Sequence, residues 1–281
     1  VHGAGIEDGV IQGYLQMIGI PFVGNNIYSA VVSQDKILSK QILEFNNLPI
    51  PKYVWFFDND YYKDKEVLFK KIDKLEYPLI IKPATLGSSV GIEVINRKEE
   101  LDSTIEKVLR YDRKIIIEEK IKDFLEYNIS VLKTNDKLML SAIEECIVDR
   151  EYKIFSDNYL TKSEEDNKVK KICPAKLDEK MEADIKKMAT NAVSLFNNTG
   201  ICRVDFLYDK KEKKLYVNEV ENIPLCFSHH LWEEVNISYK ELLNILIEDT
   251  IKNINKSSEK ITTIDSNILK NLTTKDIREM K

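Results

Sequence analysis

Apolar residues recur along the chain with spacings that predict a series of amphipathic helices. Side chains three to four positions apart predict a first helix, which Gly19 ends; they are Ile11, Tyr14, Leu15 and Ile18. Ser33 is expected to cap a second helix that runs to about Phe45. Further helices are expected at residues 63–75, 178–197, 227–234 and 239–255. Another, charged helix is expected after residue 95 and ends at about residue 111.

Shorter apolar runs between these helices predict strands. They lie at residues 20–24, 51–57, 77–95 (two strands around a glycine loop), 115–117, 126–134, 137–145, 201–209 and 214–224. The segment 149–172 is long, charged and without periodicity, which is typical of a lid or binding loop. This mixture of elements predicts an α/β protein.

The composition excludes several classes of protein. The 281 residues include 43% hydrophobic and 32% charged ones, with a formal net charge of -5, which gives no indication of a nucleic-acid binder. No apolar run has the length of a membrane span, and no signal peptide is visible. The four cysteines form no CxxC pair, so we expect reduced thiols in a cytoplasmic protein. Because Val1 opens inside a motif, VHGAGIEDG, we expect a further N-terminal portion.

Three carboxylates lie on one predicted β-hairpin near the C-terminal end. Side chains two positions apart share a strand face, so Glu219 and Glu221 lie together, and a paired strand can aim Asp205 at the same place. Such carboxylates repel one another unless cations lie between them, and oxygen ligands suit Mg²⁺. The hairpin therefore predicts a magnesium site. The alternative is a solvated acidic edge strand.

A glycine loop at residues 85–91 follows a predicted strand that ends in Lys82. Gly87, Ser88 and Ser89 offer close backbone approach, hydroxyls and N–H groups to a phosphate, and Lys82 can meet the same phosphate. An ordinary hairpin turn explains the pattern equally well, because the loop is neither a Walker A loop nor a dinucleotide fingerprint.

Further charged groups stand next to predicted strand ends. Glu118, Glu119 and Glu126 flank a buried strand and can accept hydrogen bonds from an adenine or a ribose, although solvated glutamates are common at such places. Arg203 shares a strand face with Asp205, where it can bind phosphate, steady an oxyanion, or hold the carboxylates apart as a salt bridge.

The order of these parts closely resembles the ATP-grasp superfamily and, within it, the D-alanine–D-alanine ligase family with its D-lactate and D-serine relatives. The resemblance runs from His2 to about Ile251. It is carried by four segments: HGAGIEDGVIQGYLQMIGIPFVG, SQDKILSK, IIKPATLGSSVGI and RVDFLYD…VNEVENIP. It implies an ATP-grasp fold of two α+β subdomains at residues 25–118 and 119–255, after a remnant of an N-terminal substrate domain (1–24) and before a polar tail (256–281).

The resemblance also implies the cofactors and their ligands. ATP would be bound by lysines, the serine loop and strand-end glutamates: Lys36, Lys82, Gly87, Ser88, Ser89, Glu118 or Glu119, and Glu126. Two Mg²⁺ ions would be held by Asp205, Glu219 and Glu221. The implied reaction activates a carboxylate as an acyl phosphate, which an amine then attacks, giving a dipeptide for peptidoglycan synthesis.

Catalytic and substrate-binding roles are implied in the same way. Arg203 would stabilise the tetrahedral oxyanion, with Ser89 and Glu7 near the substrate. The amino acid substrates would meet His2, Tyr159 of the lid, Ser228 and His230. A homodimer is a further expectation from the family.

Four departures from the family pattern leave alternatives open. This chain has Glu221 where the family has asparagine and Asn158 where it has the lid lysine. It has Leu225 where the family has glycine and His230 where it has the acceptor-binding serine. An enzyme with a different acceptor is therefore one alternative, with the His230 imidazole binding an anion or accepting a proton. A degenerate protein that binds nucleotide without ligating is another.

Overall fold

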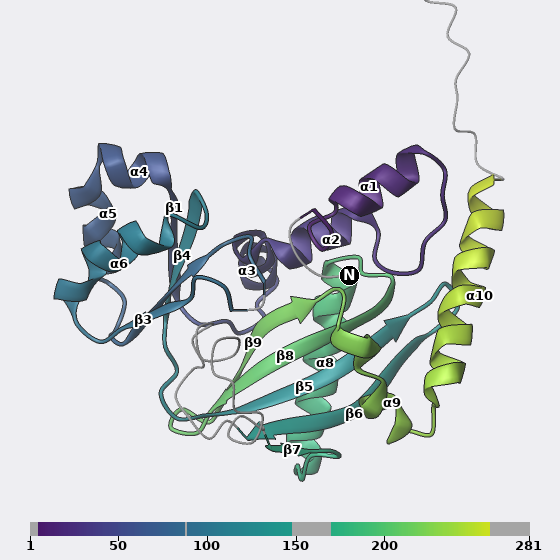
Figure 1. Ribbon diagram of the computed structural model, residues 1–281. Helices are drawn as coiled ribbons and strands as arrows, with labels where there is room; N and C mark the ends of the chain where they lie inside the picture. The colour runs from purple at the N-terminus through teal and green to yellow at the C-terminus, as the bar shows by residue number, and fades with distance from the viewer. Residues whose placement is uncertain (1–4, 88, 148–169, 259–281) are drawn as a thin grey trace, which may run out of the picture.

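Two antiparallel sheets organise the residues that this computed structural model describes, 5–87, 89–147 and 170–258 (Figure 1). The first sheet has the strand order β1-β4-β2-β3, and the second has the order β7-β6-β5-β8-β9. Their strands are β1 (Tyr53–Phe57), β2 (Leu79–Pro83), β3 (Glu93–Ile95), β4 (Lys114–Glu119), β5 (Phe124–Lys133), β6 (Leu138–Ile147), β7 (Lys170–Ile172), β8 (Gly200–Asp209) and β9 (Lys214–Glu221).

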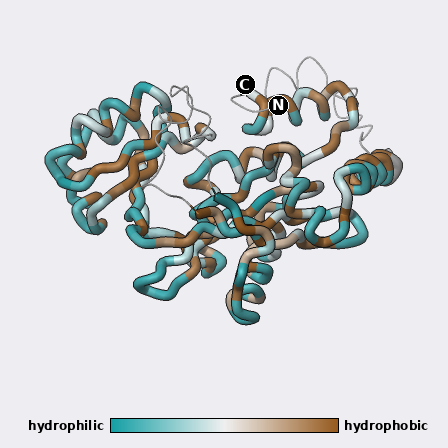
Figure 2. Tube along the Cα trace, turned by 60° about the horizontal axis from the view of Figure 1, so that its bottom comes forward, coloured by the Kyte–Doolittle hydropathy of each residue, from teal (hydrophilic) through white to brown (hydrophobic). Residues whose placement is uncertain are grey.

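The helices are distributed around these sheets. They are α1 (Val10–Met17), α2 (Ile27–Gln34), α3 (Lys36–Phe45), α4 (Asp58–Lys63), α5 (Lys65–Ile72), α6 (Leu101–Val108), α8 (Glu179–Leu195), α9 (His229–Glu233) and α10 (Tyr239–Ser258). Helices α4 to α6 gather against the first sheet, α8 lies behind the second, and α3 lies between the two sheets (Figure 1). Figure 2 shows hydrophobic segments along the inner strands and hydrophilic ones along the outer loops.

Both faces of the first sheet carry buried β-branched residues, although the face towards α3 also carries Lys82 and Glu118. Ile115 and Ile117 of β4 belong to the core formed with α4, α5 and α6, whereas Ile116 points the other way and packs with Ile37 of α3. This alternation fixes the register of β4 between β1 and β2. It leaves Glu118, two positions after Ile116, on the face that α3 covers.

The second sheet has one apolar and one polar face. Ile129 and Val131 of β5 and Val204 of β8 pack in a core that includes Ile185 and other residues of α8. The alternate positions of β5 and β8 point to the opposite face and are mostly polar; they include Glu126, Asn128, Ser130, Arg203 and Asp205. The charged groups expected at the site therefore share one face of this sheet.

Most expected elements are present, and the differences have local causes. The prediction of a strand at residues 20–24 is wrong, because residues 20–22 are irregular and residues 23–24 form a bend in which Gly24 has a φ of 127°. The prediction that Ser33 caps the second helix is also wrong. Asp35 separates α2 from α3 and caps α3, because its carboxylate accepts hydrogen bonds from the backbone N–H groups of Ile37 and Leu38. An Asp35–Lys114 ion pair of 2.6 Å holds that carboxylate in place.

Two further expectations are modified. The helix expected at 63–75 is the shorter helix α5, and α4, which precedes it and ends at Lys63, was not expected. The helix expected at 227–234 begins only at His229, after a 3-10 turn that contains left-handed residues. The domain division at residues 118 and 119 stays a prediction. Within the described residues, no helix has both the length and the apolar character that a membrane crossing needs.

Candidate active site

A cleft of about 290 Å³ lies between the two sheets and is lined mainly by charged and polar side chains. Helix α3 and the first sheet contribute Lys36, Lys40, Lys82 and Glu118, and the loop after β2 contributes Gly87 and Ser89. The second sheet contributes Arg203, Asn218, Glu219 and Glu221. Groups that the sequence separates by more than a hundred positions thus face one space.

Buried lysines surround a single buried carboxylate at one wall of the cleft. Glu118 is 2% exposed, and its two oxygens lie 3.3 Å from Lys40 Nζ and 2.9 Å from Lys82 Nζ. Burial alone would raise the pKa of Glu118, but Lys40 and Lys82 outweigh it and lower the pKa to about 2. Burial lowers the pKa of Lys36, whose Nζ donates to the Leu86 carbonyl at 2.5 Å, and Glu219 opposes that shift from across the cleft.

The glycine loop is held from both sides. Asp112 accepts from the Thr85 backbone N–H at 2.9 Å and from its hydroxyl at 2.8 Å, and Gln34 donates to the Thr85 carbonyl at 2.9 Å. Ser89 has a φ of 58° and Gly91 a φ of 71°. A Cβ on Gly91 would lie 2.8 Å from Pro83 Cγ, so the return of the loop requires glycine there.

The acidic hairpin forms the opposite wall. Asp205 on β8 pairs in register with Glu219 on β9, and Arg203 pairs with Glu221. A bulge between these strands leaves Asn218 without an opposite residue. Arg203 donates from Nε and Nη2 to the two oxygens of Asp205 at 2.6 and 2.7 Å, and Nη2 also lies 2.7 Å from Glu221 Oε2.

Comparisons with known proteins decide the family. A family model described as "D-ala D-ala ligase C-terminus" matches residues 42–248. A D-alanine–D-alanine ligase of Thermosipho africanus is 33% identical over 267 residues, which cover 95% of this chain and 71% of that protein. The chain belongs to the D-alanine–D-alanine ligase family. It is thus an ATP-dependent ligase by class, and the resemblance drawn from its motifs is confirmed.

Solved structures of the D-alanine–D-alanine ligase family confirm the ATP-grasp fold. The D-alanine–D-alanine ligase of Coxiella burnetii has a TM-score of 0.77 at 26% identity and covers 92% of this chain and 68% of its own. The VanG D-Ala:D-Ser ligase of Enterococcus faecalis has a TM-score of 0.74 at 29% identity, covering 89% of this chain and 71% of its own. A D-alanine–D-alanine ligase of Bacillus anthracis, solved in complex with ATP, has a TM-score of 0.72 at 25% identity. This match covers 92% of this chain and 79% of that ligase.

The carboxylates expected to bind Mg²⁺ suit the ion in chemistry but not in their present arrangement. Burial, opposed by Arg203, raises the pKa of Glu221 to about 8, and burial together with Asp205 raises the pKa of Glu126 to about 7. Such an excess of oxygen ligands and negative charge suits a divalent cation. Within residues 5–87, 89–147 and 170–258, however, no three His, Cys, Asp or Glu side chains are arranged to hold a metal. The Arg203 fork occupies both oxygens of Asp205.

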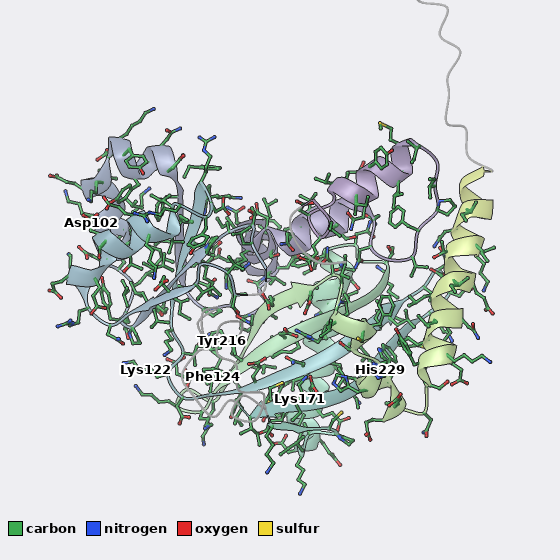
Figure 3. All side chains as sticks on the ribbon, in the orientation of Figure 1. Asp102, Lys122, Phe124, Lys171, Tyr216 and His229 are labelled. Carbon is green, nitrogen blue, oxygen red and sulfur yellow. The ribbon has the colours of Figure 1, made fainter. Side chains whose placement is uncertain are left out.

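The structure separates the two glutamates whose register the sequence left open. Glu118 faces the lysines of the cleft, whereas Glu119 pairs with Lys52 at 3.3 Å and lines a second cleft of about 320 Å³. Figure 3 labels Lys122 and Tyr216, which line that second cleft with Glu119. Glu126 is half-buried on β5, opposite Cys146 of β6 and Leu207 of β8.

The remaining expected residues have mixed positions. Glu7 is 8% exposed and lines the main cleft. Ser228 is 2% exposed, and His230 is bound through Nε2 to Glu144 at 2.8 Å. The expected residues His2, Ser88 and Tyr159, and the departure at Asn158, lie outside the described residues.

Several residues of the site were missed by sequence reasoning. Lys40 lies one turn after Lys36 on α3, so the helical spacing of four could have placed both on one face. Asn222 donates to the Glu7 carbonyl at 2.9 Å, and its own carbonyl accepts from Asn25 at 2.8 Å. These asparagines attach the N-terminal segment to the end of β9. Nothing in their local pattern distinguishes them from loop residues.

Proposed function

We propose that this chain is an ATP-dependent carboxylate–amine ligase that joins two D-alanine molecules into a dipeptide precursor of peptidoglycan. One observation carries the proposal: Lys36 and Lys82 from one side, and Arg203 and Glu219 from the other, line a single cleft. Phosphoryl transfer depends chiefly on positioned positive charge, and dipeptide formation on an oxyanion stabiliser. The family membership supplies the class of reaction.

The phosphate-binding role falls to the lysine wall and the glycine loop. Lys36 and Lys82 would meet phosphate oxygens together with the backbone around Gly87 and the hydroxyl of Ser89, which line the same cleft. Ser88 keeps the phosphate-binding role that the family resemblance implies. Glu118 forms ion pairs with Lys40 and Lys82 and lines the same cleft, so we assign it rather than Glu119 to the nucleotide side. Glu126 is assigned to the ribose. The Bacillus anthracis relative complexed with ATP supports a nucleotide in this cleft.

The acidic hairpin would bind the metal ions and stabilise the oxyanion. Asp205, Glu219 and Glu221 are the residues that would hold Mg²⁺, and Arg203 would turn from Asp205 towards the developing oxyanion. When bound, ATP and Mg²⁺ supply the phosphoryl group and the neutralising charge that activate the first carboxylate. Glu7 and His2 would lie near the first amino acid, Tyr159 would belong to the lid, and Ser228 would lie near the acceptor. The cytoplasmic location and the homodimer stay predictions.

A ligase with a different acceptor is the second candidate. The similarity to the VanG D-Ala:D-Ser ligase and the His230 ring turned towards Glu144 both favour it. The third candidate, a nucleotide-binding protein without ligase activity, draws its support from the departures at Asn158 and Leu225. The lysines, Arg203 and Asp205 argue against it, because a protein that only binds nucleotide has no need of an oxyanion stabiliser.

One experiment separates these candidates. The full-length protein is incubated with Mg-ATP and pooled D- and L-amino acids while ADP release and product mass are followed. D-Alanyl-D-alanine as the product supports the main proposal, and a different dipeptide supports the second candidate. Tight ATP binding without turnover on any pool leaves only the third.

A further inference from the structure

A buried asparagine that lines the main cleft ties the end of β9 to two earlier segments of the chain. Asn222 is 4% exposed, and its Nδ2 donates to the Glu7 carbonyl at 2.9 Å and to the Ala30 carbonyl of α2 at 3.5 Å. Helix α2 lies beside the end of β9 (Figure 1). One amide group therefore holds the N-terminal segment and α2 against the acidic hairpin.

A network of buried polar groups fixes Asn222 in turn. Asn25 Nδ2 donates to the Asn222 carbonyl at 2.8 Å. Asn25 Oδ1 accepts from the Thr199 backbone N–H at 2.8 Å and from Asn198 Nδ2 at 3.1 Å. Because Asn25 and Asn198 are 2% and 1% exposed, these hydrogen bonds are costly to break, and the network favours a single arrangement. The backbone of Asn222 is thus anchored, and its side chain holds both segments at a fixed distance from β9.

The two segments carry the side chains that flank the glycine loop. A Cβ on Gly87 would lie 3.6 Å from Glu7 Oε2 and 3.8 Å from Gln34 Nε2. Gln34 is the last residue of α2 and donates to the Thr85 carbonyl at 2.9 Å. The Glu7 carboxylate therefore lies close to the backbone of the loop that we assign to phosphate binding.

A carboxylate in this position opposes the binding of phosphate. Glu7 is buried and lines the same cleft as Lys36 and Lys82. Like charges repel, and the repulsion is stronger in a partly desolvated cleft than in water. The ammonium group of an amino acid donates charge-assisted hydrogen bonds to carboxylates. When it pairs with Glu7, the charge beside the glycine loop is neutralised and the nucleotide phosphates meet less repulsion.

We propose that Glu7 is a charge link between the two substrates: the ammonium group of an amino acid pairs with its carboxylate and thereby strengthens nucleotide binding. Asn222 is the positioning residue that holds Glu7 in this place. The inference rests on the proposed ligase function and deepens it, because it couples the amino acid to the nucleotide through one residue. The coupling is reciprocal, so the nucleotide strengthens amino acid binding by the same factor. The phosphoryl donor is then held tightly only when an amino acid is present.

Calorimetric titration of the full-length protein with Mg²⁺ and the non-hydrolysable ATP analogue AMP-PNP measures the coupling without turnover. We expect saturating D-alanine to lower the Kd of the analogue about tenfold, equivalent to about 1.4 kcal/mol. Propionate differs from D-alanine by lacking the ammonium group and should leave the Kd unchanged. No effect of D-alanine, or equal effects of D-alanine and propionate, would overturn the proposal.

Variants separate the charge of Glu7 from its positioning. Glu7→Gln lacks the charge, so it should bind the analogue more tightly than the wild type does without D-alanine, and D-alanine should change its Kd less than about twofold. Asn222→Leu has a similar size but cannot donate to the Glu7 carbonyl, so its coupling should fall below about threefold. If this variant does not fold, the smaller polar variant Asn222→Ser takes its place.

The matched control is Asn198→Leu, at a buried asparagine of the same network whose described hydrogen bonds go to Asn25 and Ser33. It should lower stability but keep the coupling at about tenfold. Full coupling in Glu7→Gln, or equal losses of coupling in the Asn222 and Asn198 variants, would overturn the proposal.

The outcome is separable from that of the ligase assay. Dipeptide formation without coupling between D-alanine and the analogue would overturn the inference and leave the proposed function standing. Coupling without any dipeptide product would support the inference while the proposed function fails.

Discussion

Replacing Glu118 by glutamine is expected to destabilise the protein strongly although it removes no apolar contact. Glu118 is the buried carboxylate between Lys40 and Lys82, at 3.3 and 2.9 Å from their Nζ atoms. The glutamine has nearly the same volume and can still accept a hydrogen bond. It leaves the buried ammonium groups without a compensating charge, which is the unfavourable half of a broken buried ion pair.

The size of the effect follows from the pKa of Glu118. Burial would raise this pKa, but Lys40 and Lys82 lower it from 4.5 to about 2, which corresponds to about 3 kcal/mol of stability. Breaking a buried pair typically costs about 3–5 kcal/mol, in the same range. Because the folded pKa lies below the unfolded value, this contribution is complete above about pH 4.5 and is lost as the pH falls towards about 2.

Urea unfolding followed by tryptophan fluorescence measures the change. Near pH 7 the Glu118→Gln variant should lose about 3 kcal/mol of unfolding free energy, and the difference from the wild type should shrink below about pH 4.5. The matched control is Glu119→Gln on the next residue, whose partner Lys52 is 68% exposed and whose loss should cost less than about 1 kcal/mol. Adding Lys40→Met to Glu118→Gln should restore stability, because it removes one unpaired charge. Equal losses at Glu118 and Glu119, or no recovery with Lys40→Met, would refute the reasoning.

Three further predictions concern the cleft. Glu221→Asn, which removes the additional carboxylate beside Arg203, should keep or raise the rate of ADP release; a loss above about 100-fold, roughly 2.7 kcal/mol of barrier, would contradict it. Arg203→Lys cannot reproduce the fork to Asp205 and should lower ligase turnover about 100-fold, whereas near-normal turnover would show that a point charge suffices. Gly91→Ala should lower the unfolding free energy by about 1–3 kcal/mol, because its Cβ would lie 2.8 Å from Pro83. Gly19→Ala is the control, because Gly19 has a similar φ but open space around the added Cβ. Equal thermal midpoints for the two variants would contradict the prediction for Gly91.

Local pattern was enough to predict most elements and the family. The alternation along β5 and β6 and the turn between them, the helical spacing of α8, and the pairing of Asp205 with Glu219 are all encoded within short stretches of chain. The order of the Lys-Pro, Gly-Ser-Ser, Arg-x-Asp and Glu-x-Glu segments was specific enough to indicate the ATP-grasp ligases. Local pattern failed at Ser33, where a better cap, Asp35, stood two positions on and was fixed by distant Lys114.

Most elements, the family and the residue types of the site could thus be read from local patterns along the chain. Which of these residues contact one another depends on the folded arrangement of distant segments. Glu118 and Glu119 are chemically identical neighbours on β4, and the lysines beside the first come from α3 (Lys40) and from β2 (Lys82). Glu144 and His230 stand 86 positions apart, and Arg203 faces both Asp205 and Glu221 because of the strand register. The residue type at a single position gives the chemistry of a side chain, whereas the pairing of charges depends on which faces the folded chain brings together.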